Sequence, residues 1–475
     1  MSGLKGNLVD RLWQSPTLMT SGSIGVRLLG LGAMLPLALN RLPVDEANLW
    51  FLFSSLLAII TLIDFGFSPT FTRFVAYCRT EQEVGQSKAM PIRNLAATTM
   101  AAGPVIATMR HIYNGVGIVA FVVAATAGSI AVAGPIGQLD EPQGGWAAWA
   151  VIAVVGSIGL RSGMYSTYLQ GVEQIALYRR WEILIGIISA SVGCVILIAG
   201  GGLLEIVVST QIGVLVNAWV NRKLAISVSS PQEWSDRPIV DRDIMDAVWP
   251  AAWRSGIGVL MSAGVIQGTG VMYAQLSTPE ESAPYLLALR LIQSIRTFSN
   301  VPFYTRLPSL ARKYAEGRLD RIVDIARVGM NRTNWMLLAG VVAVGFFGEA
   351  LIELIRSKTP FVAPAIWGML GLAILVERVG AMHLQLYSTT NHVVWHIANG
   401  VSGIIMLTAI PFAYARFGVL GFPLGILIGY VTFYAPYSIR LSYRAFKLRI
   451  TDMDLSASIF PIMLLLVLEI ALLLE

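Results

Sequence analysis

Long apolar runs recur along the chain from near Thr17 to its C-terminal end. A run of about 18 residues or more can cross a hydrocarbon core of about 30 Å as a helix. The pattern therefore predicts an all-α polytopic membrane protein with two sets of six spans and one extra C-terminal hydrophobic helix. The spans are expected at 17–40, 47–72, 112–133, 146–170, 178–200 and 203–221, then at 249–275, 282–307, 333–355, 362–387, 393–415 and 417–439, with the last run at 455–474.

An internal repeat relates the two sets of spans. A shift of 233 residues lays the tripeptide IGV at 24–26 on IGV at 257–259, and PTFTRF at 69–74 on PFYTRL at 302–307. Since each set has an even number of spans, both have the same orientation in the membrane. The domains are expected to be a six-helix lobe at 1–222, a cytoplasmic linker or surface helix at 223–248, a second six-helix lobe at 249–445, and the additional helix at 455–475.

The distribution of basic residues predicts the topology. Of the 34 Lys and Arg residues, an N-terminus-inside arrangement places 24 in cytoplasmic segments and four in external loops, as the positive-inside rule requires. We expect a multi-pass protein of the cytoplasmic (inner) membrane with a cytoplasmic N-terminus. The net charge of +6 follows from these loops, so nucleic-acid binding is not expected.

Composition and motifs narrow the class of function. The chain is 55% hydrophobic and only 13% charged, which excludes a soluble enzyme. It shows no nucleotide-binding glycine loop and no Ser/His/Asp arrangement. Its four histidines form no metal-ligand constellation, since His392 and His396 are four residues apart but no HExxH motif accompanies them. We therefore expect no enzyme activity, no cofactor and no metal. Duplicated six-helix bundles are typical of alternating-access transporters, and transport would draw on a gradient of H⁺ or Na⁺, the membrane potential or the substrate itself.

Arginines within the spans are the main candidates for binding. Six arginines fall inside predicted spans and away from the span ends: Arg27, Arg161, Arg254, Arg290, Arg296 and Arg378. They stand against two clear carboxylates, Asp64 and Glu377, and Glu469 of the last run. An ionised side chain at the bilayer centre costs about 2.5–3.5 kcal/mol on insertion scales, so each should face a partner or an aqueous cavity. We expect a water-filled cationic chamber that binds phosphate oxygens bidentately. Snorkelling or interhelical ion pairs remain the alternative. The arginines assigned to the chamber are Arg27, Arg161, Arg254 and Arg290.

Helical spacing predicts uncharged polar side chains on the same helix face as two of these arginines. Tyr165 and Tyr168 share a face with Arg161 in the fourth span, and Gln293 shares a face with Arg290 in the eighth. Such polar stripes are typical of helices that line an aqueous path. Tyr165, Tyr168 and Gln293 are therefore predicted to bind substrate with the arginines.

A second group of residues is predicted to couple or gate transport. Asp64 could bind a proton or cation, or it could cap a helix or pair near Arg73 and hold a gate closed. Gly66 and Pro69 are expected to interrupt the helix beside it. Arg306 is the repeat counterpart of Arg73. Glu377 is the other candidate, although with Arg378 it could form a local ion network.

The segment DFGFSPTFTRF at 64–74 resembles the signature after the second helix of the polysaccharide (O-antigen and exopolysaccharide) flippases, in the multidrug/oligosaccharidyl-lipid/polysaccharide exporter superfamily. LQG at 169–171 is similar to a recurrent element there. The resemblance implies a MATE-like fold whose two lobes form a V-shaped central cavity. It also implies a flippase that translocates polyprenyl-diphosphate-linked oligosaccharide from the cytoplasmic to the outer leaflet for cell-surface polysaccharide synthesis. Arg27 and Arg254 would contact the diphosphate and acidic sugars.

The same resemblance suggests partners and an alternative. Membrane lipids, and glycosyltransferases or a polymerase of the same pathway, would be partners of such a flippase. The thirteen apolar runs depart from the twelve or fourteen spans of common members, which leaves the topology of the last run open. A multidrug or small-molecule exporter of the same superfamily, driven by an ion gradient, is the alternative function. Such an exporter should show carboxylates and aromatic side chains in its cavity.

Overall fold

The protein is described by a computed structural model at residues 13–84, 102–229, 234, 241–316, 318–390, 392, 394–449 and 453–474. Every regular element in this part of the chain is a helix. Ten of the described helices are long and apolar enough to cross a membrane. The prediction of an all-α polytopic membrane protein is confirmed. The chain divides into two compact units, Met1–Gly256 and Ile257–Glu475.

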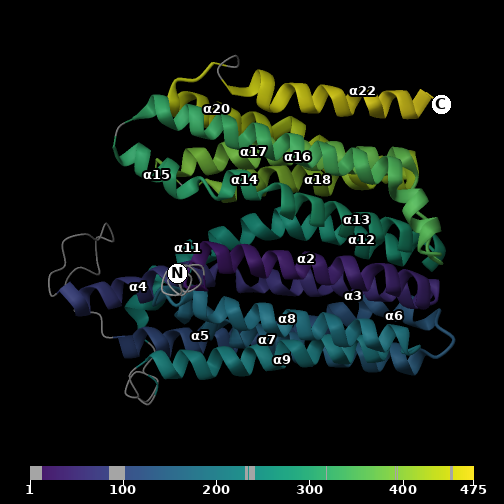
Figure 1. Ribbon diagram of the computed structural model, residues 1–475, viewed down its shortest axis with the longest axis horizontal. Coiled ribbons are helices and arrows are strands. Elements are labelled where there is room, and N and C mark those ends of the chain that lie inside the picture. The colour runs from purple at the N-terminus through teal and green to yellow at the C-terminus, as the bar shows by residue number, and fades with distance from the viewer. Residues whose placement is uncertain are drawn as a thin grey trace, which may run out of the picture. The chain divides into compact units, whose positions relative to one another are not determined.

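The first unit is built around α7. This helix contacts α4, α5 and α9, while α2 packs along α8, and Figure 1 shows α7 among its neighbours. The short helix η1 follows α3, and the π-helical turn η2 joins α5 to α6. The elements are α2 (Pro16–Arg41), α3 (Val44–Thr61), η1 (Leu62–Asp64), α4 (Phe67–Val84), α5 (Ala102–Val123), η2 (Ala124–Gly128), α6 (Ser129–Gly137), α7 (Pro142–Gly171), α8 (Ile175–Ile198), α9 (Leu203–Val228) and α11 (Arg242–Val259).

Side-chain caps fix where helices of the first unit begin. Ser15 precedes α2, and its hydroxyl accepts a hydrogen bond from the backbone N–H of Leu18. Glu46 of α3 accepts from the backbone N–H of Leu203 over 2.8 Å, at the first residue of α9. A carboxylate at a helix N-terminus satisfies an orphan donor and interacts favourably with the helix dipole. The Glu46 contact therefore also holds the start of α3 against the start of α9.

The second unit is built around α17, where almost every residue from Ile366 to Leu386 is buried. α16, α19, α20 and α22 contact it, and Figure 1 shows the unit's long helices side by side. The elements after α11 are η3 (Leu260–Gly264), α12 (Val265–Leu276), α13 (Pro279–Ser299), α14 (Val301–Tyr304), α15 (Leu307–Ala315), α16 (Leu319–Leu354), α17 (Pro364–Ser388), α18 (Trp395–Phe417), η4 (Gly418–Leu420), α19 (Gly421–Gly429), η5 (Tyr430–Tyr434), α20 (Ala435–Phe446), η6 (Leu455–Ile459) and α22 (Phe460–Leu474).

The boundary between the units lies inside α11 and not in a linker. Ile244, Val248 and Ala252 of this helix are buried in the hydrophobic core of the first unit. Of the expected linker at 223–248, residues 223–228 continue α9, whereas 230–233 and 235–240 lie outside the described residues. At the other end, α22 packs on α16 and α17. The extra C-terminal helix is therefore part of the second unit.

The second predicted span of each repeat is interrupted, and the two interruptions lie at corresponding positions. In the first unit, Phe65 and Gly66 adopt positive φ angles of 46° and 75°, so α3 and η1 end before α4 begins. In the second unit α13 ends at Ser299 and the short helix α14 follows. The predicted spans 47–72 and 282–307 are thus not continuous helices. The expected interruption at Gly66 is confirmed, whereas Pro69 lies inside α4 and does not interrupt it.

Candidate functional site

A polar cavity of about 510 Å³ lies within the first unit and is called the first-unit cavity here. Its charged lining comes from Arg27 of α2, Asp64 of η1, and Arg179 and Glu182 of α8. The charged groups of this wall are therefore balanced, with two cations and two carboxylates. Uncharged polar groups from α5, α7 and α9 also line it, among them Tyr113, Thr167, Gln170, Gln211, Asn217 and Asn221.

Two arginines converge on one carboxylate in this cavity. Arg27 Nη2 forms an ion pair with Oε1 of Glu182. Arg179 Nη1 lies 2.5 Å from the other oxygen, Oε2. The Glu182 side chain is only 15% exposed, whereas that of Arg27 is 65% exposed. Because each guanidinium carries five N–H donors, one shared carboxylate leaves donors for a further anion.

Glu182 and Arg179 are charged residues of this site that the sequence interpretation missed. That interpretation counted Asp64 and Glu377 as the clear carboxylates inside spans, yet Glu182 stands in α8 and within the predicted span 178–200. Its pairing with Arg27 shows that part of the arginine excess is neutralised. The spacing of Arg179 and Glu182, three residues apart on one helix, was the available signal.

Asp64 lies at the end of η1, where it caps the next helix. Its Oδ2 accepts a hydrogen bond of 3.3 Å from the backbone N–H of Ser68. The Tyr113 hydroxyl also interacts with the Asp64 carboxyl group. Thr167 joins the group, because its hydroxyl lies 2.9 Å from that of Ser68 and 3.2 Å from that of Tyr113. Arg73, one of the predicted gating residues, is exposed and donates through Nε to the carbonyl oxygen of Pro69.

The backbone beside Asp64 is held in place by α11. A Cβ on Gly66 would lie 2.7 Å from the Cβ of Ser255, and a Cβ on Gly256 would lie 1.9 Å from a ring carbon of Phe65. Only glycine fits such close approaches, and the φ of Gly66 also favours glycine. The interruption after Asp64 is therefore fixed by packing as well as by local conformation.

The predicted polar face of α7, formed by Arg161, Tyr165 and Tyr168, does not line the first-unit cavity. Arg161 donates through Nε to Oδ1 of Asn114 over 2.7 Å, and it lines a separate, largely apolar groove against α5. Tyr165 and Tyr168 pack on Trp234, with ring centroids 5.5 and 5.4 Å apart. The structure therefore does not bring these three residues together with Arg27.

Arg254 and Arg306 contact neighbouring aromatic and backbone groups. The exposed Arg254 guanidinium lies 6.0 Å from the centroid of the Trp253 ring. Arg306 Nη1 donates to the carbonyl oxygen of Ile325 over 3.4 Å. This hydrogen bond joins the turn before α15 to α16, as a structural contact does.

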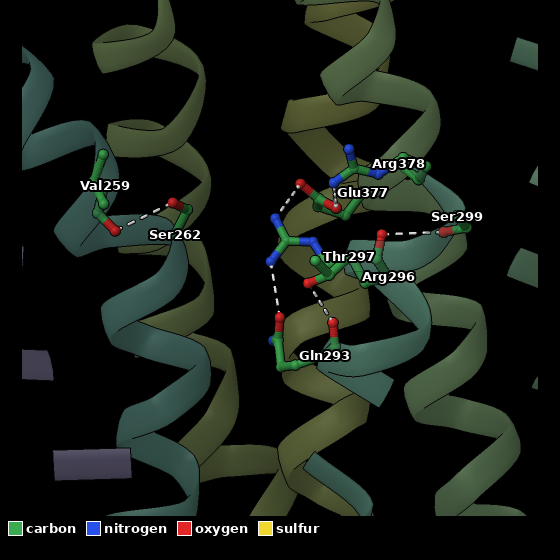
Figure 2. Close-up of polar contacts among 8 residues, drawn as sticks. All are labelled: Val259, Ser262, Gln293, Arg296, Thr297, Ser299, Glu377 and Arg378. Carbon is green, nitrogen blue, oxygen red and sulfur yellow. Dashed lines mark hydrogen bonds and ion pairs between the residues drawn. The ribbon is translucent and has the colours of Figure 1, made fainter. Parts of the chain in front are cut away.

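The second unit holds a cluster of charged side chains between α13 and α17, formed by Arg296, Glu377 and Arg378 and called the second-unit charge cluster (Figure 2). Glu377 Oε1 lies 3.0 Å from Arg296 Nη2, and its Oε2 lies 2.9 Å from Arg378 Nη2. Two cations thus share one carboxylate here too. The sequence suggested a local ion network of Glu377 and Arg378, and the structure adds Arg296 to it.

This cluster leaves hydrogen-bond donors unused. Arg378 is 2% exposed, and its Nε and Nη1 have no hydrogen-bond partner among the described residues. The same holds for Arg296 Nε and for the hydroxyl of Tyr430. Buried polar groups are normally hydrogen-bonded. The cluster therefore has the charge and the free donors to hold an anion or ordered water.

Gln293 contacts the second-unit charge cluster. Its Oε1 accepts a hydrogen bond of 3.1 Å from Arg296 Nη1, as Figure 2 shows. Arg290 is half-buried on the same helix, and its carbonyl oxygen accepts from the Ser294 hydroxyl. The pairing of Gln293 with Arg296 follows their three-residue spacing, which also places them on neighbouring positions of one helix face.

Comparisons with known proteins support the fold. No family model and no curated protein sequence matches the chain. A solved structure described as the inward-facing conformation of a multidrug resistance MATE family transporter of the MOP superfamily matches with a TM-score of 0.62 and 13% identity, over 91% of this chain and 94% of that one. The lipid II flippase MurJ in an inward closed conformation matches with a TM-score of 0.61 and 12% identity, over 96% and 92% of the two chains.

A third similar structure is a MOP superfamily transporter from Pyrococcus furiosus, whose description reports a binding pocket of reversed polarity. Its TM-score is 0.53 at 11% identity, over 92% of this chain and 97% of that one. The chain has the MATE-like fold. At these identities the shared property is the fold, and it is common to drug transporters and to a lipid flippase.

Proposed function

We propose that the protein is a flippase that moves polyprenyl-diphosphate-linked oligosaccharide from the cytoplasmic to the outer leaflet by alternating access. It would serve cell-surface polysaccharide synthesis in the cytoplasmic membrane, with its N-terminus in the cytoplasm. The fold supports this proposal, because the lipid II flippase MurJ shares it over most of both chains. The observation that carries the proposal is the accessible Arg27 guanidinium in the first-unit cavity.

The chemistry of this site suits a diphosphate. Arg27 and Arg179 present planar donor groups from adjacent helices around one carboxylate, and guanidinium groups bind phosphate oxygens bidentately. In the proposed cycle, the diphosphate takes the place of the Glu182 carboxylate as the partner of Arg27. When the headgroup leaves, Glu182 neutralises the arginine again. The ion pair would thus keep Arg27 from being an unpaired charge within the membrane when no substrate is bound.

A second candidate function is export of small molecules driven by an ion gradient. Asp64 and Glu182 line the same cavity as the two arginines, and carboxylates are the groups expected to bind organic cations. Asp64 would then bind the coupling H⁺ or Na⁺. The flippase proposal is favoured because Glu182 is already engaged by two arginines and Asp64 by Ser68 and Tyr113.

Reconstitution into liposomes separates the two functions. A fluorescent polyprenyl-diphosphate oligosaccharide is placed in one leaflet, and its arrival in the other is followed by quenching from outside. A parallel set of liposomes is loaded with a cationic dye under a pH or Na⁺ gradient. The flippase proposal expects transfer of the lipid and no export of the dye. Gradient-driven export of the dye without lipid transfer would establish the alternative.

A further inference from the structure

α22 carries one ionisable residue in an otherwise apolar helix. The helix has the sequence FPIMLLLVLEIALLL, in which Glu469 is the only charged or polar side chain. It packs against α16 and α17. The preceding turn η6 is anchored by Asn334 of α16, whose Nδ2 donates to the carbonyl oxygen of Ala457 over 2.7 Å. The position of Glu469 within the second unit is therefore set by helix packing on two sides.

The Glu469 carboxyl group rests on the backbone of α17. A Cβ built on Gly368 would lie 1.6 Å from Oε2 of Glu469 and 2.7 Å from its Cδ. The absence of a side chain at Gly368 thus creates the space that the carboxyl group fills. Glu469 is 2% exposed, and neither of its oxygens has a hydrogen-bond partner among the described residues.

No cation stands beside this carboxyl group in the described part of the chain. On α17, Glu377 is paired with Arg296 and Arg378. Other ionisable groups on the neighbouring helices have partners of their own or are exposed. His383 of α17 contacts Asp454, which precedes η6. Glu349 and Glu353 of α16 are exposed.

We propose that Glu469 is a proton-binding site. An ionised carboxylate in apolar surroundings, without a donor or cation, is strongly unfavourable compared with the neutral acid. Glu469 therefore carries a proton while its carboxyl group lies on Gly368. When α22 moves away from α17 and water reaches the group, the carboxyl releases one H⁺ to water and becomes a carboxylate. Binding of the proton and docking of α22 on α17 are thereby linked.

The inference does not depend on the transported substrate. A hydrophobic carbodiimide reacts with protonated carboxyl groups in apolar sites, so it reports directly on this state. We would treat the purified full-length protein in detergent with dicyclohexylcarbodiimide between pH 5 and pH 9 and measure adducts by peptide mass spectrometry. Glu349, an exposed carboxyl group on α16, is the internal reference. The proposal expects Glu469 to be labelled at neutral pH at least tenfold more than Glu349.

Two variants test the assignment. Glu469→Gln should remove the adduct and keep α22 docked, so its thermal stability should be the same at pH 6 and pH 9, whereas that of the parent protein falls at pH 9. Gly368→Ala should displace the carboxyl group and reduce labelling to the level of Glu349. The proposal is overturned if Glu469 and Glu349 react equally at every pH, or if the Gly368→Ala variant is labelled as strongly as the parent protein.

Discussion

Arg27 of α2 and Glu182 of α8 stand 155 residues apart in the sequence and form an ion pair in the first-unit cavity. The arginine is the more accessible partner, and the carboxylate is further engaged by Arg179. A pair of this kind can exchange a protein carboxylate for a ligand anion without leaving a charge unpaired in the membrane. The proposed transport cycle depends on that exchange.

Removing the competing carboxylate should strengthen binding of the anion. In Glu182→Gln the shape of the side chain is retained and its charge is lost, so a diphosphate no longer displaces a carboxylate from Arg27. We expect the half-saturating concentration of lipid-linked substrate in the liposome assay to fall several-fold. Maximal transfer should not rise, because release of the headgroup becomes slower. A higher half-saturating concentration in this variant would show that Glu182 helps to bind the substrate directly.

The glycine after Asp64 should be essential for the fold of the first unit. Gly66 has a φ of 75°, and a Cβ there would meet Ser255 at 2.7 Å. A non-glycine residue in the left-handed region costs about 1–2 kcal/mol, and the close contact adds to this. We expect Gly66→Ala to lower the melting temperature in detergent clearly. Gly25→Ala is the matched control, since a Cβ at Gly25 meets no atom within 4 Å. Equal melting temperatures for the two variants would contradict this account.

Glu377 should stabilise the second unit strongly. Its carboxylate pairs with both Arg296 and the fully enclosed Arg378, and removing one partner of a buried ion pair costs about 3–5 kcal/mol. Glu377→Gln should therefore destabilise the protein by roughly that amount in denaturant or thermal unfolding. Glu349→Gln, at an exposed glutamate of α16, should change stability little. If Glu377→Gln were as mild as this control, the cluster would be compensated by water or an anion.

Asp454 should anchor the C-terminal helix over the whole physiological pH range. Burial alone would raise the pKa of its carboxyl group, but His383 and hydrogen bonds from Tyr443 and Ser458 hold this pKa at about 2. A carboxyl whose folded pKa lies below its unfolded value stabilises the fold above the unfolded pKa. The contribution is lost only as the pH falls from about 4 towards 2.

Asp454→Asn should accordingly lower thermal stability at pH 7 by about 1.5–3 kcal/mol, the range for hydrogen bonds to charged groups. Limited proteolysis should then release a C-terminal fragment that contains α22. Ser458→Ala, which removes a single donor to Asp454, serves as the milder comparison and should give a smaller loss. Unchanged stability in Asp454→Asn would mean that α22 is held by its apolar contacts alone.

Much of the fold is predictable from the sequence because apolar length sets the spans. The predicted runs correspond to α2, α7, α8, α17 and α18 within a few residues, whereas α9 begins at the predicted Leu203 but continues to Val228. Other bounds depend on features that apolar length does not report. α16 begins at Leu319, well before the expected 333, because a basic amphipathic segment continues the same helix. The left-handed residues Phe65 and Gly66 end the second span early.

The candidate site was harder to predict because it depends on contacts between distant residues. Helical spacing predicts that Arg161, Tyr165 and Tyr168 share a face of one helix, but it cannot say which neighbours that face meets. The partner of Tyr165 and Tyr168 is Trp234, from the segment between the last helices of the first unit. Likewise, Arg27 and Glu182 come together only because α2 packs along α8.

The most direct test of the account is the leaflet-transfer rate of Arg27→Ala measured with a lipid-linked diphosphate oligosaccharide. Arg41→Ala is the control, since Arg41 is on the same helix and does not line the first-unit cavity. Loss of a charge-assisted hydrogen bond to phosphate is worth about 1.5–3 kcal/mol, so transfer at low substrate should fall roughly tenfold or more. We predict that loss for Arg27→Ala and near-parental transfer for Arg41→Ala. Parental transfer by a well-folded Arg27→Ala variant would contradict the claim that this guanidinium receives the diphosphate.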